Sequence, residues 1–139
     1  MWNRLWARSR ANAVWYINQE LEPYLYTLTV GDKPVYIPAG GLSQKPYGTL
    51  FGRPVVPLEQ CSAAGEIGDI ILADVGQYLL IDKGGMKAAS SIHVRFLYDE
   101  NVFRFIYRVD GKPIWNKPLK PFKGSASVSP FVVLEKRNA

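Results

Sequence analysis

The sequence predicts an α+β fold, with a mixed sheet flanked by helices. Three observations indicate this class. Several apolar runs have the length of strands, one such run leads through a capping residue into a helical pattern, and a late stretch alternates between apolar and polar residues. With 139 residues, 47% of them hydrophobic, the chain is long enough to form a packed core.

The first expected elements are a helical turn and a buried strand. Trp2, Leu5 and Trp6 have the i, i+3, i+4 spacing of one helical face. The apolar run at residues 13–17 (AVWYI) consists of strand-forming residues and predicts a central strand.

Asn18 predicts the start of a helix directly after that strand. Its side chain is a good N-cap, and Glu20 and Glu22 follow near the positive end of the helix. Pro23 is compatible with this helix because it falls in or near the first turn. The inner stripe of the helix consists of Leu21, Leu25 and Leu28.

The middle of the chain predicts strands separated by turns. Residues 31–47, with three prolines and three glycines, predict a long and mobile excursion, a strand edge or hairpin with its tip at residues 39–43. Residues 50–58 predict a strand that Pro54 and Pro57 place at a sheet edge or beside a bulge. Two further strands, 70–73 and 78–81, are expected in the mixed sheet, joined by a tight turn or one helical turn; their apolar runs are Ile70 to Ala73 and Tyr78 to Ile81.

The last third of the chain alternates strictly. Residues 91–96 predict a strand, and residues 103–109 place Phe103 and Phe105 on the face opposite Arg104. We expect these segments to form a half-buried hairpin with the aromatic face inside. A final strand is expected over residues 128–134, and the late strands should leave the compact part as an extension.

The composition argues against several classes of protein. The net charge of +5 comes from 17 basic and 12 acidic residues, but these are scattered, which favours a mildly basic surface over a dedicated nucleic-acid site. The single cysteine, Cys61, excludes an internal disulfide framework and fits a reducing compartment. The sequence shows neither an apolar run of about 18 residues, as a membrane span requires, nor a signal-peptide pattern.

No catalytic, cofactor-binding or metal-binding residues are predicted. The single histidine, His93, is expected on the outer face of a strand, and Cys61 lacks an adjacent positive group to activate it. Asp69, Asp74 and Asp82 recur along one segment, but they are better explained as turn formers and partners of Arg or Lys than as cation ligands. We therefore expect no enzyme, no cofactor and no small-molecule substrate.

Several motifs, taken in order, resemble the major capsid proteins of tailed phages of the HK97 type. AVWYIN at residues 13–18 resembles the strand and asparagine at the entry to that family's axial domain, and YGTLFGRPVVP at residues 47–57 is similar to its LxGxPV strand. GDIILAD at residues 68–74, with QY at 77–78 and IDK at 81–83, and RVDGKP at residues 108–113 resemble later elements. The resemblance covers nearly the whole chain and matches the C-terminal, axial-domain half of the family, so the chain resembles a fragment.

The resemblance implies a structural head protein whose copies form the pentamers and hexamers of an icosahedral phage or prophage shell. Residues 1–90 would form the axial domain and residues 91–139 the late strands that return to the peripheral domain. The implied partners are other copies of the chain, with packaged DNA as a further candidate and no membrane. The implied location is the virion, preceded by the host cytoplasm.

Two alternatives stay open: an encapsulin-like compartment shell, which shares the fold, and a basic nucleic-acid-binding module. Alone, the fragment is expected to be a monomer or small oligomer that forms no closed shell. Either Trp2, Leu5 and Trp6 or the faces of the late strands should lack their usual covering.

Overall fold

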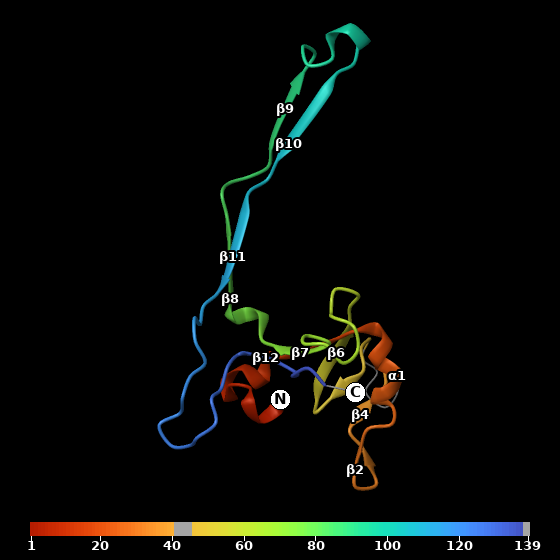
Figure 1. The fold of residues 1–139 in the computed structure, drawn as a ribbon, viewed down its shortest axis with the longest axis vertical. Helices are drawn as coiled ribbons and strands as arrows, with labels where there is room; N and C mark the ends of the chain where they lie inside the picture. Colours follow the sequence, from red (N-terminus) through yellow and green to blue (C-terminus); the bar gives the residue numbers. More distant parts are fainter. Residues whose placement is uncertain (41–45, 138–139) are drawn as a thin grey trace. The chain divides into compact units, whose positions relative to one another are not determined.

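The computed structural model describes residues 1–40 and 46–137. It divides into two compact units: unit 1 comprises Met1–Gln77 and Trp115–Ala139, and unit 2 comprises Tyr78–Ile114 (Figure 1). Unit 1 contains a six-stranded sheet and short helices, whereas unit 2 is a two-stranded ribbon. The α+β class is confirmed.

The sheet of unit 1 is mixed, with the strand order β12-β7-β1-β6-β5-β4. Its central strand β1 pairs in parallel with β6, where Trp15 lies opposite Val55, and antiparallel with β7, where Trp15 lies opposite Leu72. The prediction of a buried central strand is confirmed. The strands span Tyr36–Ile37 (β4), Thr49–Leu50 (β5), Arg53–Pro57 (β6), Val14–Ile17 (β1), Ile70–Ala73 (β7) and Phe131–Val133 (β12).

The core of unit 1 gathers around β1. Trp15 and Ile17 are buried because alternate residues of a strand point to the same face. The Trp15 indole N–H donates a hydrogen bond to the carbonyl of Leu50 at 3.0 Å, which satisfies the polar atom of an otherwise apolar side chain. The other members of the cluster are Leu5, Ala13, Leu25, Tyr36, Leu50, Val55 and Leu72.

Asn18 caps a helical segment, as predicted. Its side-chain oxygen accepts from the Glu20 N–H at 2.9 Å. A 3-10 turn, Gln19–Leu21, leads into the α-helix α1, Glu22–Leu25, with Pro23 in its first turn. Leu28 lies beyond the helix and is exposed, so the expected leucine stripe is shorter than predicted.

The N-terminal segment forms two 3-10 helices, Trp2–Arg4 and Ala7–Ala11, and no continuous helix. Leu5 interrupts them because it forms a β-bridge with Ser129, and it is fully buried. Trp2 stacks on Trp15, with ring centroids 6.4 Å apart, and Trp6 packs against Trp115 at 4.8 Å. Leu5 is therefore covered within unit 1, and Trp2 and Trp6 are half-buried there. Of the two surfaces that we expected to lack covering, the late strands are the exposed one.

The excursion after α1 contains a small hairpin. Strands β2 (Thr29–Val30) and β3 (Lys33–Pro34) pair around Gly31, whose positive φ of 64° suits the tight turn. Strand β4 then forms one edge of the sheet, which agrees with the prediction of an edge strand in this segment. The predicted tip at residues 39–43 and the expected mobility fall largely on residues 41–45, which lie outside the described residues.

The proline-containing strand lies inside the sheet, so its predicted edge position is wrong. Strand β6 has β1 on one side and the short β5 on the other. Pairing with β1 begins at Val55, after Pro54, so the missing N–H of Pro54 interrupts no bond on that side. The β5–β6 turn uses positive φ angles at Phe51 and Gly52.

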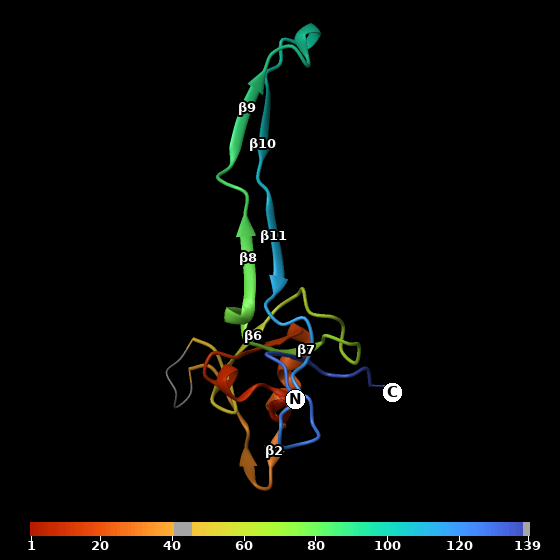
Figure 2. The same cartoon turned by 90° about the vertical axis from the view of Figure 1, so that its left-hand side faces the viewer.

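Unit 2 is a ribbon built from two consecutive strand pairs, which both views show end to end (Figure 2). Strands β8 (Tyr78–Asp82) and β11 (Val109–Pro113) form one antiparallel pair. Strands β9 (Lys87–Ser91) and β10 (Val102–Ile106) form the other. The predicted order of strand, helical turn and strand is confirmed by β7, the 3-10 turn Val75–Gln77 and β8.

Three predictions for the late strands are corrected. Strand β8 pairs with β11 and does not join the mixed sheet. The alternating residues 92–96 are no strand, because β9 ends at Ser91 and the chain reverses through a 3-10 turn at Phe96–Tyr98. The final strand β12 does not leave the compact part: it pairs with β7, with Phe131 opposite Ala73.

Candidate functional site

The aromatic face of β10 is exposed, although the sequence predicted that it is buried. Phe103 lies opposite Ser90 and Phe105 opposite Ala88 in the β9–β10 pairing, so small neighbours leave both rings uncovered. Phe103 is 65% exposed and Phe105 63%. A ribbon of two strands has no second layer, so strict alternation cannot place one face inside a core.

The turn at the end of the ribbon, which we call the ribbon tip (residues 92–101), is also apolar. Leu97 is 93% exposed, and Phe96 and Tyr98 are similarly open. Asp99 adopts a left-handed conformation, with φ 53°, that closes the 3-10 turn. Within the ribbon tip, the side chains of Arg95 and Glu100 form an exposed ion pair at 3.0 Å.

These exposed side chains make unit 2 a candidate contact surface. An isolated two-stranded ribbon is marginally stable in water, because neither face buries enough apolar area. Large exposed apolar surfaces on soluble proteins generally mark sites of association. In strand β8 of the same unit all five residues are exposed, among them Leu79, Leu80 and Ile81.

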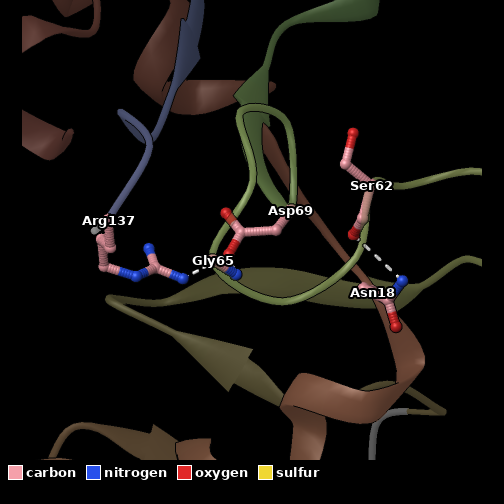
Figure 3. A network of polar contacts seen from close by, with 5 residues as sticks. All are labelled: Asn18, Ser62, Gly65, Asp69 and Arg137. Atoms are coloured by element: carbon pink, nitrogen blue, oxygen red, sulfur yellow. Dashed lines mark hydrogen bonds and ion pairs between the residues drawn. The ribbon is translucent and has the colours of Figure 1, made fainter. Parts of the chain in front are cut away.

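Unit 1 contains a buried polar network (Figure 3). Asp69 is fully buried, and its carboxylate accepts from the Gly65 N–H at 2.9 Å and forms an ion pair with the Arg137 guanidinium. Asn18 donates from its side-chain amide to the carbonyls of Cys61 at 3.1 Å and Ser62 at 3.0 Å.

The network ties three distant segments of unit 1 together. The Asn18 N–H donates to the Asp69 carbonyl at 3.0 Å, which joins the end of β1 to the start of β7. The Arg137 N–H donates to the Gly65 carbonyl at 3.0 Å, so the C-terminal segment is held to the same loop. A buried carboxylate needs a partner of this kind, since an unpaired buried charge is strongly unfavourable.

The network confirms the predicted role of Asp69 as a partner of a basic residue. Sequence reasoning did not identify Arg137 as that partner. Asp74 is a turn former, as expected: its side chain accepts from the Gly76 N–H at 3.1 Å. Asp82 ends β8 and is exposed. Residues 1–40 and 46–137 contain no cluster of three or more acidic, histidine or cysteine residues suited to a metal ion.

The two residues considered for nucleophilic chemistry are not placed for it. His93 lies exposed in the ribbon tip and not on a strand, which corrects its predicted position. Cys61 is buried, and burial together with the nearby charge of Asp69 raises the pKa of its thiol above the usual value. A raised pKa keeps the thiol protonated and unreactive near neutral pH.

The pKa of Tyr36 is also displaced. Burial, with the charge of Glu22 as the next cause, raises the pKa of Tyr36 to about 12. Its hydroxyl donates to the Glu22 carboxylate at 3.4 Å, a long contact. The phenol is therefore neutral at physiological pH, and its ring is part of the hydrophobic core of unit 1.

Beside α1, unit 1 has an apolar hollow of about 470 Å³. Its lining includes the apolar side chains of Leu21, Leu25 and Ile70, and Arg137 also lines it. Among the described residues, no helix has the length and apolar character needed to cross a membrane.

Comparison with known proteins identifies similar sequences and folds. The model of the family described as "Phage capsid family" matches residues 1–124. A solved structure described as "Capsid of empty GTA particle computed with C5 symmetry" is similar to the chain, with a TM-score of 0.58 and 21% sequence identity. The similarity covers 78% of this chain and 37% of that one. No curated protein matches significantly.

Proposed function

The chain belongs to the phage capsid family, and from this premise we propose that it is a structural shell subunit without catalytic activity. The uncovered apolar surface of unit 2 is the observation that carries the proposal. Monomeric proteins rarely expose an apolar surface of this kind, whereas in a shell neighbouring subunits cover it.

The chain spans 37% of the length of the capsid chain to which it is similar. We propose that unit 1 is the axial domain and that unit 2 returns to the peripheral domain, where the remainder of a longer protein or a neighbouring copy covers it. This proposal changes the expected boundaries of 1–90 and 91–139. Strand β8 is assigned to the ribbon, because it pairs with β11, and β12 is assigned to the axial domain, because it belongs to the six-stranded sheet.

Assembly into pentamers and hexamers, with other copies as the principal partners, is part of the proposal. We also propose that the protein is located in the virion, that it is in the host cytoplasm before assembly, and that it contacts packaged DNA. The match to a phage family favours a viral shell over an encapsulin-like compartment. The charge of +5 supports the second candidate, a nucleic-acid-binding module.

Light scattering and sedimentation velocity of the purified chain test the proposal over a range of concentration and salt. We expect monomers and small oligomers that grow with concentration, because a closed shell needs contacts both within and between capsomers and the chain spans only 37% of the capsid chain to which it is similar. Uniform shell-sized particles would show that this part suffices for closure. A strictly monomeric chain at every concentration would contradict self-association through unit 2.

Two variants test whether the oligomers form through the ribbon of unit 2. The double substitution Phe103→Ser and Phe105→Ser should abolish the oligomers, whereas Phe122→Ser, at a fully exposed phenylalanine of unit 1, should leave them unchanged. Equal loss in both variants counts against a specific ribbon contact. A gel shift at near-physiological salt tests the second candidate, since a dedicated nucleic-acid binder retains measurable affinity there.

A further inference from the structure

The ribbon of unit 2 is interrupted by a bulge between its two strand pairs. Lys83 donates its backbone N–H to the Arg108 carbonyl at 3.0 Å, and strand pairing resumes where Lys87 lies opposite Ile106. Residues 84–86 therefore lie opposite a single residue of the other strand. An insertion of this kind leaves backbone groups unpaired and opens the ribbon locally.

The bulge borders a hollow of about 250 Å³, lined by Lys83, Gly85, Lys87, Ile106 and Arg108. Ile106, which is half-buried, provides an apolar wall, and three of the other side chains are cationic. None of the described residues that line the hollow carries a carboxylate. Within residues 1–40 and 46–137, no ion pair joins any of these cations to an acidic side chain.

Three like charges around one hollow repel each other, and a bound anion relieves that repulsion. The cations also differ usefully in geometry. The Arg108 guanidinium presents a planar fork that matches two oxygens of an oxyanion, while Lys83 and Lys87 act as point charges with rotatable donors.

The backbone of the bulge adds further donors. Gly84 has a positive φ of 76°, and the N–H groups of residues 84–86 donate to no backbone carbonyl within the described part of the chain. Successive free N–H groups around a left-handed residue form a concavity that suits anions. A Cβ at Gly85 would meet no atom within 4 Å, so the space beside this backbone is open to a ligand.

We propose that this hollow is a phosphate-binding site, in which Lys83, Lys87 and Arg108 neutralise the phosphate and the bulge N–H groups orient it. The phosphate is either free inorganic phosphate or a phosphate of a nucleic-acid backbone. The inference depends on the geometry of the ribbon and is independent of the proposed shell role.

Titration of the full chain with inorganic phosphate, followed by amide NMR at constant ionic strength, tests the site. Saturable shifts should be confined to residues 83–87 and 106–108. The triple variant Lys83→Gln, Lys87→Gln, Arg108→Gln should weaken binding about tenfold or more, because hydrogen bonds to charged groups are the strong ones. The control Lys112→Gln, on β11 and outside the hollow, should bind as the parent does.

Two further titrants complete the experiment. Acetate at the same ionic strength should bind more weakly, and equal or tighter binding of acetate would overturn the assignment to phosphate. Absence of saturable shifts, or equal shifts in the triple variant, would overturn the site itself. A short single-stranded oligonucleotide that competes with phosphate for the same amides assigns the nucleic-acid backbone as the source; lack of competition assigns free phosphate.

Discussion

Units 1 and 2 are both built from short strands that contain apolar residues, but they bury these residues very differently. In unit 1, Leu72 of β7 is fully buried because β1 and β12 flank it and the core covers its face. In unit 2, Leu80 of β8 is 68% exposed, since β8 has one neighbouring strand. The difference shows that apolar strand residues form a core only where the topology supplies a second layer. Unit 1 therefore has a core of its own, whereas the apolar side chains of unit 2 are largely exposed.

The largest expected effect comes from a matched pair of leucines. Leu72→Ala should lower the free energy of unfolding by about 2–5 kcal/mol, because it leaves a cavity in the core. Leu80→Ala should change it by less than about 0.5 kcal/mol, as for other surface substitutions. Urea unfolding followed by tryptophan fluorescence measures both. Similar losses for the two leucines would remove the distinction between the units.

The next effect concerns the ion pair within unit 1. Arg137→Met should destabilise the chain by about 1–3 kcal/mol, because it leaves the buried Asp69 carboxylate without its cation; the half-exposed position of Arg137 keeps the effect below that of a fully buried pair. Lys136→Met is the control. It breaks a largely exposed ion pair with Glu66 and should cost roughly 0–1 kcal/mol. Equal unfolding midpoints in urea for the two variants would contradict the importance of the network.

A smaller effect is expected at the helix cap. Asn18→Asp retains an oxygen that accepts from the Glu20 N–H, but it loses the two hydrogen bonds donated to the carbonyls of Cys61 and Ser62. The expected loss is about 1–2 kcal/mol in thermal or urea unfolding. Asn101→Asp, the same change at an exposed position of the ribbon tip, should be neutral. A neutral Asn18→Asp would show that those two bonds add nothing to stability.

The smallest effect is on the reactivity of Cys61. Its thiolate is disfavoured in the folded chain because its pKa is raised, chiefly by burial. Alkylation should therefore be slower in the folded chain than in urea at the same pH, and its rate should continue to rise with pH above the usual range of a free thiol. Equal rates in folded and unfolded chains would contradict the burial of this side chain.

Much of unit 1 could be predicted from local patterns. The apolar run before Asn18, the capping residue itself and the turn after Asp74 each carry their own structural information within a few residues, and each was predicted correctly. The partner of Asp69 could be predicted by type but not by position. Arg137 lies far away in the sequence, and only the folded chain brings the two together.

The ribbon could not be predicted in the same way. Alternation in β10 shows which residues share a face, but not whether a second layer covers that face. Strand β9 (KAASS) lacks an apolar periodicity and forms because β10 supplies its partner. Residues 92–96 alternate although they turn, since the chain must reverse between β9 and β10. The position of β12 depends on β7, with which it pairs across a long separation in sequence.

The pairing of β12 with β7 has a consequence for how such a protein can change over evolution. The chain leaves the sheet at Ala73 and re-enters it at Phe131, directly opposite. The Asp74 N–H also donates to the Pro130 carbonyl at 3.0 Å, so a hydrogen bond joins the point where the chain leaves the sheet to the point where it returns. Unit 2 (Tyr78–Ile114), which lies between them, is therefore topologically an insertion into unit 1. Because each doubling of a flexible loop costs only about 0.6 kcal/mol of closure entropy, insertions and deletions there leave the sheet intact.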